Sequence, residues 1–194
     1  LDSRGEREVR HGEDRRQGQR GIRGRIRVEE GESWGELLPH SGFHLDVEID
    51  FSSDVIGRQR VSYEMSPGVF RNEISRCRTF GFMSDVERLW KAGLALGANL
   101  TNTVAIGEDK IMNREGLRHP HEFVRHKMLD AIGDLTLAGH PMLAAYRSVR
   151  GGHRLNSLVV KALLADTDAW TLVQAPRVRE RSPVDIGLAI AAGE

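Results

Sequence analysis

The chain has 194 residues, of which 39% are hydrophobic, so it is long enough to bury a core as one large domain or two small ones. Its 28 basic and 28 acidic side chains give a formal net charge of zero, which excludes a global field that would draw it to nucleic acid or to an anionic membrane. The lone cysteine, Cys77, excludes an internal disulfide and fits a reducing compartment. No apolar run approaches the ~20 residues that span a bilayer, and no secretory signal is visible, so we expect no transmembrane segment and a cytoplasmic protein.

The first part of the chain changes from a charged segment to strand patterns. Residues 1–20 hold almost nothing to bury, so we expect them to be disordered or a linker. The chain does not begin with Met, which suggests a piece cut from a longer or damaged open reading frame. Apolar and polar residues alternate along residues 43–51, which is the clearest strand pattern in the chain. Further strands are predicted over residues 22–28 and 59–63.

Helical patterns come next. Ser66 and Pro67 form a helix start, with the serine as N-cap and the proline in the first turn, and we expect this helix to end near residue 78. Cys77 falls on its apolar face, where an inert buried thiol is favoured over a nucleophile. A short helix is predicted over residues 83–92 and a hairpin over residues 104–112.

The strongest helical pattern spans residues 122–139 and has two different faces. His126, Asp130 and Asp134 follow one another at intervals of four, so they form a ladder along the helix. A histidine and an aspartate one turn apart can both ligate one divalent cation, as two of the three protein ligands of a catalytic zinc. On spacing alone, a solvated face with a His–Asp hydrogen bond is the plainer interpretation. The opposite, core-facing stripe is formed by Val124, Met128, Ala131, Ile132 and Leu135.

The remaining elements complete the prediction of the fold. Residues 141–149 suggest a strand and residues 155–164 a helix, while residues 175–194 are expected to form a weakly ordered tail. The order of strands, helices, a hairpin, a long helix, a strand and a helix predicts the α+β class, with helices packed on a mostly antiparallel sheet. We expect one compact domain with ragged ends.

Five blocks of the sequence carry a resemblance when they are taken together. They are SRCRTFGF (75–82), LALGANLTNTVAI (94–106), the run 113–117, EFVRHKMLDAIGDL (122–135) and RGGHRLN (150–156). In this order they resemble the C-terminal half of the UDP-3-O-acyl-N-acetylglucosamine deacetylases, the zinc amidases that act in lipid A (lipopolysaccharide) biosynthesis. The resemblance runs from about residue 22 to about residue 173. The N-terminal domain of that family, which supplies a general-base glutamate and the third zinc ligand, a histidine, has no counterpart here.

The resemblance implies a more detailed architecture. Residues 21–174 would form the C-terminal catalytic half-domain, a layered sheet-and-helix unit that is the second domain of the deacetylase. A small insert of a helix and a hairpin would form a passage for the acyl chain. The metal would lie between this unit and the missing N-terminal half.

The resemblance also implies roles for single residues. His126 and Asp130 match two zinc ligands, although Fe²⁺ accepts the same donors. His153 matches a catalytic histidine that steadies the oxyanion and protonates the leaving amine, and Asp134 matches its acidic partner. Thr79 matches a threonine whose hydroxyl supports the oxyanion.

The remaining matches concern substrate binding, and each has a plainer alternative. Lys127 matches a lysine that meets the nucleotide diphosphate, but it could be a surface lysine. Phe80, Phe82 and Met83 could offer faces for a sugar ring and an acyl chain, or they could belong to the core. Four other histidines show no partner pattern in the sequence: His11, His40, His44 and His140.

The implied reaction is zinc-dependent hydrolysis of the N-acetyl group of UDP-3-O-(3-hydroxyacyl)-N-acetylglucosamine. Its partners would be this UDP-linked acylated glucosamine and the missing N-terminal half of the same enzyme. Because the general base and one metal ligand are absent from these residues, we expect the isolated chain to be inactive or nearly so. The alternative is a non-catalytic fragment or a sugar-nucleotide-binding module.

Overall fold

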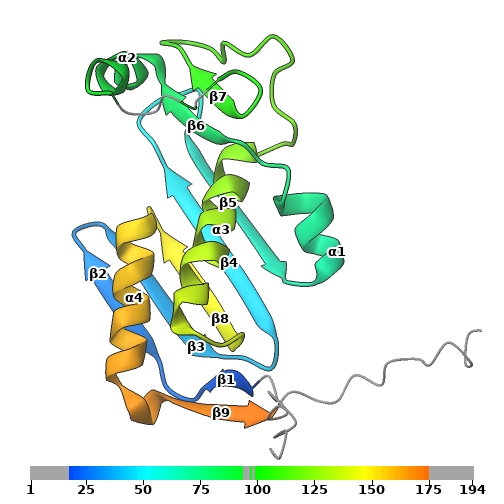
Figure 1. Cartoon of the computed structure of the whole chain (residues 1–194), viewed down its shortest axis with the longest axis vertical. Helices are drawn as coiled ribbons and strands as arrows, with labels where there is room; N and C mark the ends of the chain where they lie inside the picture. The colour runs from blue at the N-terminus through cyan, green and yellow to red at the C-terminus, as the bar shows by residue number, and fades with distance from the viewer. Residues whose placement is uncertain (1–17, 94–96, 98, 175–194) are drawn as a thin grey trace, which may run out of the picture.

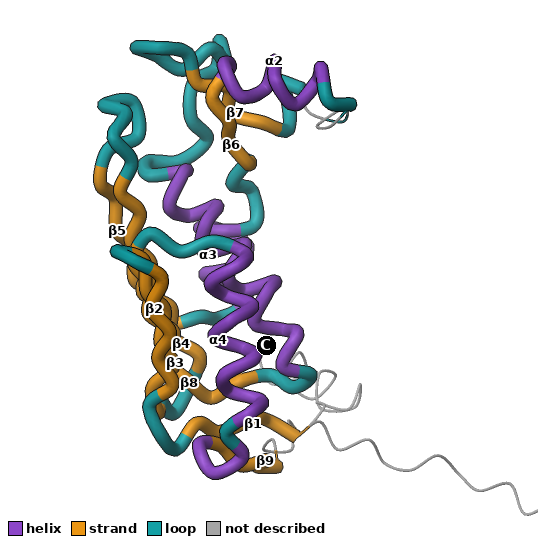
Figure 2. Tube along the Cα trace, turned by 90° about the vertical axis from the view of Figure 1, so that its left-hand side faces the viewer, coloured by secondary structure: helices purple, strands orange, loops and turns teal. Residues whose placement is uncertain are grey.

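The computed structural model describes residues 18–93, 97 and 99–174. Seven strands form one mixed sheet, and the helices α3 and α4 lie against one of its faces (Figures 1 and 2). A smaller unit with two strands and a helix stands at one end of these layers (Figure 1). The architecture confirms the predicted α+β class.

The strand β8 is the centre of the large sheet. It pairs antiparallel with β3 and parallel with β4 and β1, while β2 pairs with β3, β5 with β4 and β9 with β1, all antiparallel. The sheet is therefore mostly antiparallel, as predicted. The strands are β1 (Gly18–Ile22), β2 (Ile26–Glu30), β3 (Ser33–Pro39), β4 (Phe43–Asp50), β5 (Arg58–Glu64), β8 (Met142–Val149) and β9 (Trp170–Gln174).

The two faces of the sheet differ because the residues of β4 alternate. Leu45, Val47 and Ile49 are buried under the helices, as the strand pattern predicted. Asp46 and Glu48 point to the other face, which no described helix covers (Figure 2). There they form ion pairs with Arg60 and Arg58 of β5, each at 2.6 Å, so paired charged side chains cover this open face.

The helical layer is built from α3 (Glu122–Leu135) and α4 (His153–Ala165). The predicted apolar stripe of α3 is confirmed, since Val124, Met128 and Leu135 have almost no exposed surface. The 3₁₀ turn η2 (Thr136–Ala138) follows, and Gly139 ends the helix in the left-handed region at φ 82°.

Four strands were not predicted, namely β1, β3, β9 and the short strand β6 (Thr79–Phe82), and the physical reasons differ. The strand β3 contains Gly35, and a Cβ atom at this residue would lie only 3.2 Å from the hydroxyl oxygen of Tyr146. It also contains Glu36, which is buried between arginines. Neither residue fits a simple alternation. The strand β1 begins at Gly18, before the predicted boundary at residue 21, and β9 pairs with it along its whole length. The expectations for residues 1–17 and 175–194 lie outside the described residues.

The small unit differs from the predicted helix and hairpin. It consists of β6 (Thr79–Phe82), α2 (Met83–Lys91) and β7 (Thr103–Ile106), and β6 and β7 pair in parallel, so it is a strand–helix–strand unit. Residues 106–112 do turn back on β7, but they form a single bridge between Ile106 and Ile111 and no second strand. The prediction of a hairpin was therefore wrong in its pairing.

The segment that follows β5 begins as predicted and ends earlier. Ser66 caps α1 (Pro67–Val69) by accepting the Val69 N–H at 3.1 Å, and a π-helical turn, η1 (Phe70–Ile74), continues it. Cys77 is buried, as predicted, but it lies in the turn before β6 and not on the helix.

Candidate metal and catalytic site

The helix α3 places the predicted ligands together on one side. The side chains of His126, Asp130 and Asp134 are only 15%, 13% and 18% exposed. The turn before β6 approaches His126, and the N-terminal turn of α4 approaches Asp134. The ladder is therefore a half-buried cluster and not the solvated face that spacing alone favoured.

His126 and Asp130 are arranged as a donor pair for a cation. The His126 Nε2 atom lies 3.4 Å from Asp130 Oδ1, and the His126 Nδ1 atom lies 3.4 Å from the carbonyl oxygen of Cys77. A hydrogen on Nδ1 directed at that carbonyl leaves the lone pair of Nε2 free on the side of Asp130. Burial lowers the pKa of His126, although the charge of Asp130 opposes this, so the neutral imidazole that a metal requires is favoured. The two donors fit zinc or Fe²⁺.

His153 stands at the start of α4, next to this pair. Its Nδ1 atom lies 2.9 Å from Asp134 Oδ2, and its Nε2 atom lies 3.9 Å from Asp130 Oδ2. The side chain is 70% exposed, so the ring is held at one nitrogen and open to solvent elsewhere. The predicted pairing of His153 with Asp134 is present in the geometry.

Two residues that sequence reasoning missed hold Asp134 in place. Asn156 Nδ2 donates to Asp134 Oδ2 at 2.8 Å, and the buried hydroxyl of Tyr146 donates to Asn156 Oδ1 at 2.6 Å. Burial raises the pKa of Tyr146 to about 12, so it stays a donor at neutral pH. The only signal in the sequence was an asparagine on the inward face of a predicted helix, where a polar group needs a partner.

Lys127 belongs to the same cluster. Its Nζ atom lies 3.2 Å from Asp130 Oδ2. Gly152 is also close, since a Cβ atom at that residue would lie 3.8 Å from Lys127 Nζ. The side chain of Lys127 is 19% exposed, which makes it a residue of the site and not a surface lysine. The loop before α4 is fixed by Arg150, which forms ion pairs with Glu32 and Asp50.

The aromatic residues of β6 lead away from the cluster. The ring of Phe80 lies 6.1 Å from that of His126 and 5.7 Å from that of Phe51, and the ring of Phe82 lies 6.5 Å from Phe51. Thr79 is exposed at the start of β6, and no hydrogen bond among the described residues joins it to His126 or His153. The structure thus brings Phe80 to the site and leaves Thr79 at its edge.

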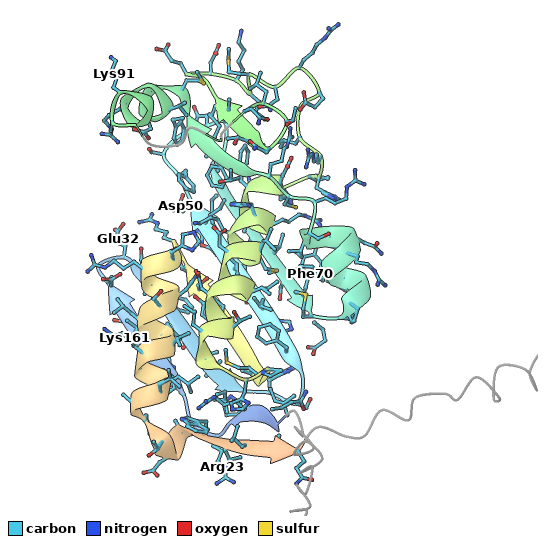
Figure 3. All side chains as sticks on the ribbon, in the orientation of Figure 1. Arg23, Glu32, Asp50, Phe70, Lys91 and Lys161 are labelled. Carbon is cyan, nitrogen blue, oxygen red and sulfur yellow. The ribbon has the colours of Figure 1, made fainter. Side chains whose placement is uncertain are left out.

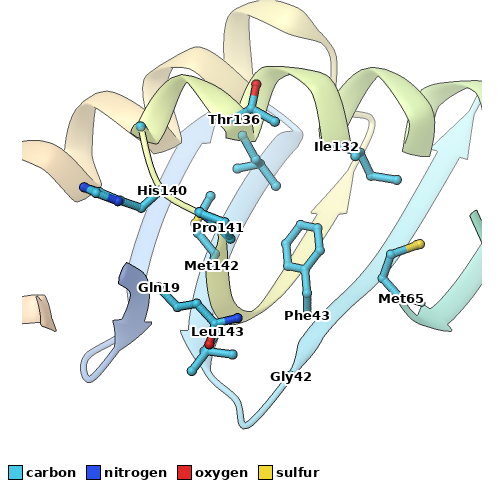
Figure 4. Close-up of a pocket in the computed structure, with 12 residues that line it drawn as sticks. Gln19, Gly42, Phe43, Met65, Ile132, Thr136, His140, Pro141, Met142 and Leu143 are labelled. Carbon is cyan, nitrogen blue, oxygen red and sulfur yellow. The ribbon is translucent and has the colours of Figure 1, made fainter. Parts of the chain in front are cut away.

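A cavity of about 1240 Å³ lies where this row of rings ends. Phe82 and Met83 line it together with the β4–β5 turn and the turn after β7. A second, mostly apolar pocket of about 620 Å³ lies at the far end of α3, between that helix and β4, β8 and β1 (Figure 4). The first cavity adjoins the predicted substrate residues, and the second does not.

A buried ion pair that sequence reasoning also missed joins the residue before β6 to the first residue of α3. The guanidinium of Arg78 donates to both carboxylate oxygens of Glu122 at 3.0 and 3.1 Å, and both side chains are almost fully buried. Burial tends to raise the pKa of Glu122, but hydrogen bonds from Arg78 and from the backbone N–H groups of Arg78 and Arg118 outweigh it and lower the pKa. This pair fixes Thr79 and Phe80 relative to the helix that carries His126.

A neutral imidazole and a carboxylate on one helix, beside a second histidine held by its own carboxylate, are donors that a metalloenzyme could use. The sequence profile described as LpxC, UDP-3-O-acyl N-acetylglycosamine deacetylase, matches residues 5–165. The chain belongs to this family, whose members are metalloenzymes.

Curated relatives agree with this assignment. Proteins named UDP-3-O-acyl-N-acetylglucosamine deacetylase from Brucella ovis, Brucella canis and Brucella melitensis are each 56% identical to the chain over 151 residues. The match covers 77% of this chain and 53% of each relative, so the chain spans about half the length of these proteins. Among the described helices, none is long and apolar enough to cross a membrane.

Proposed function

We propose that this chain supplies the C-terminal catalytic half of a zinc-dependent deacetylase that hydrolyses the N-acetyl group of UDP-3-O-(3-hydroxyacyl)-N-acetylglucosamine in lipid A biosynthesis. The observation that carries the proposal is that the exposed His153 lies next to the largely buried His126 and Asp130 in a chain that belongs to this family. The N-terminal half of the same enzyme would supply the general base and the third metal ligand. The cytoplasmic location stays a prediction.

His126 and Asp130 are the residues of this chain that would hold the metal, with zinc preferred and Fe²⁺ as the alternative. When bound, such a metal polarises the amide carbonyl and lowers the pKa of water. The carbonyl of Cys77 keeps the His126 ring in the orientation that this role requires.

His153 is the proposed acid of the reaction. Asp134 accepts the hydrogen of Nδ1, which leaves Nε2 directed toward the side of Asp130. As a cation, His153 stabilises the oxyanion that forms when the amide is attacked, and it then protonates the leaving nitrogen. The hydroxyl of Thr79 would donate to the same oxyanion, from its exposed place at the edge of the site.

The substrate would lie along the row of aromatic rings. Phe80 is near the metal ligands and would pack on the sugar, while Phe82 and Met83 line the large cavity that would take the acyl chain. Lys127 would leave Asp130 to bind the diphosphate as a mobile charge.

A second candidate is a sugar-nucleotide-binding module without catalysis, which is favoured by the match to only about half of each relative. Binding of the UDP sugar to the protein that carries both halves, without release of acetate, would identify this alternative. Turnover excludes it.

The role assignment is tested in the protein that carries both halves. We expect His126→Ala and Asp130→Ala to lose bound metal together with activity. His153→Ala should keep its metal and lose about 10²- to 10⁴-fold in kcat, because only an acid is removed. Lys161→Ala, an exposed position on α4 (Figure 3), is the matched control and should change neither quantity. Equal loss of zinc in all three site variants would show that the roles are wrong.

A further inference from the structure

A second group of metal-ligating side chains lies on the open face of the sheet. His44 on β4 and Glu64 on β5 are direct partners in the antiparallel pair, and both alternate with buried residues, so they point away from the helices. His40 lies in the turn between β3 and β4. One nitrogen from each histidine and one oxygen of the carboxylate all lie within 4.8 Å of one another.

We propose that His40, His44 and Glu64 bind one divalent transition cation such as Zn²⁺, independently of the site on α3. Two imidazoles and one carboxylate suit Zn²⁺, Cu²⁺ and Ni²⁺ better than Mg²⁺ or Ca²⁺, which prefer oxygen ligands alone. The sheet itself separates this group from His126, because α3 packs on the opposite face (Figure 2).

The ring of His44 is already set for this role. Its Nε2 atom lies 2.9 Å from the Ser62 hydroxyl oxygen, and its Nδ1 atom lies 3.4 Å from Glu64 Oε2. When Nε2–H donates to Ser62, the lone pair of Nδ1 faces the carboxylate. A hydrogen bond on the far nitrogen is the support that metal-bound histidines have in general.

Gly42 makes room for the carboxylate. A Cβ at this position would lie 2.2 Å from Glu64 Oε1, so any larger residue would displace the Glu64 side chain. The conformation of Gly42 is not left-handed, so a larger residue here would act by moving the flexible end of Glu64 and not by straining the backbone.

The geometry of His40 sets the expected strength. Its Nε2 atom lies 3.7 Å from Glu64 Oε2, while its Nδ1 atom accepts the Gly42 N–H at 3.1 Å. A cation at Nε2 requires the hydrogen on Nδ1, so binding must break the Gly42 bond. Because of this cost and the partial exposure of all three side chains, we expect a dissociation constant on the order of micromolar.

The test is a Zn²⁺ titration of this chain in a His126→Ala/Asp130→Ala background, which removes the other candidate ligands. Calorimetry should show a single equivalent bound, and NMR should show the ring signals of His40 and His44 shifting together while those of the other histidines stay in place. We expect His44→Ala and Glu64→Gln each to weaken binding at least ~10-fold, since each removes a ligand.

Two further variants make the result decisive. Gly42→Ala should also weaken binding, because it displaces the carboxylate and leaves both histidines present. His119→Ala, which removes a histidine outside the group, should have no effect. Binding only at millimolar zinc, with all exposed histidines shifting alike, would overturn the proposal, as would unchanged affinity in both His44→Ala and Glu64→Gln.

Discussion

The reactivity of the Cys77 thiol reports whether the turn that positions His126 stays closed. Its side chain is buried, and burial raises the pKa of the thiol to about 11 from the ordinary value of 9.0. At pH 8 the thiolate fraction is then about 100-fold lower than in the unfolded chain. We predict that iodoacetamide alkylates the folded chain at least ~100-fold more slowly than the urea-unfolded chain, as followed by mass spectrometry. Equal rates would mean that the turn which carries the Cys77 carbonyl toward His126 opens freely.

At the scale of residues, spacing alone placed His126, Asp130 and Asp134 on one helix, and the resemblance added His153. The hydrogen-bond partners that hold these side chains in place could not be predicted. Asn156 and the carbonyl of Cys77 come from segments far away in the sequence, and their approach depends on packing that no local pattern encodes. The same holds for His40, His44 and Glu64, because cross-strand register brings them together.

At the scale of elements, the contact between β6 and α3 depends on Arg78 and Glu122. Removing one partner of a buried pair leaves an uncompensated charge, so we predict that Glu122→Gln lowers the free energy of unfolding by roughly 3 kcal/mol at neutral pH. Urea unfolding measures this. Glu115→Gln is the matched control, because Glu115 also pairs with Arg78 but is 57% exposed, and it should lower the stability far less than Glu122→Gln does.

The same pair predicts a pH dependence. The pKa of Glu122 is lowered from its ordinary 4.5, so near and below that pH the unfolded chain binds more protons than the folded chain. The contribution of Glu122 is therefore complete above about pH 4.5 and is lost as the pH falls through the lowered pKa. The stability of Glu122→Gln should fall less steeply with acid than that of the unaltered chain. Parallel acid profiles would contradict this assignment.

Elements whose residues follow one period were predicted, and elements defined by pairing were not. β4 alternates and α3 has a continuous apolar stripe, so both were placed within a few residues. β6 has only four residues, TFGF, and pairs with β7 in parallel across α2, so nothing in its own sequence distinguishes it from a loop. β9 is likewise specified by its partner β1.

At the scale of the whole molecule, the two faces of the sheet are covered in different ways. The open face is covered by its own charged side chains, in which Arg58 and Arg60 pair with carboxylates of β4. The other face is covered by a single layer of helices (Figure 2). In the proposed enzyme the N-terminal half would lie over the metal site on this helical side, so that apolar surface there would be hidden only in the complete protein.

Phe80, Phe82 and Met83, the predicted substrate residues, are half-buried, and Phe80 packs edge-on against Phe51 and Phe123. The most exposed large apolar side chains among the described residues are instead Leu100, Met112, Leu137, Leu164 and Leu172.

We predict that the isolated chain binds a hydrophobic dye or self-associates, and that the N-terminal half of a relative, added in trans, suppresses this. Burial contributes about 25 cal/mol per Å², so even ~300 Å² of newly exposed apolar surface would matter beside a total stability of ~5 to 15 kcal/mol. Dye fluorescence and light scattering, with and without the added half, measure the effect. An unrelated protein of similar size is the control for crowding, which should leave the dye signal unchanged. A monomer that does not bind the dye, and whose fluorescence and scattering do not change when the N-terminal half is added, would count against the assignment of this chain as one of two catalytic halves.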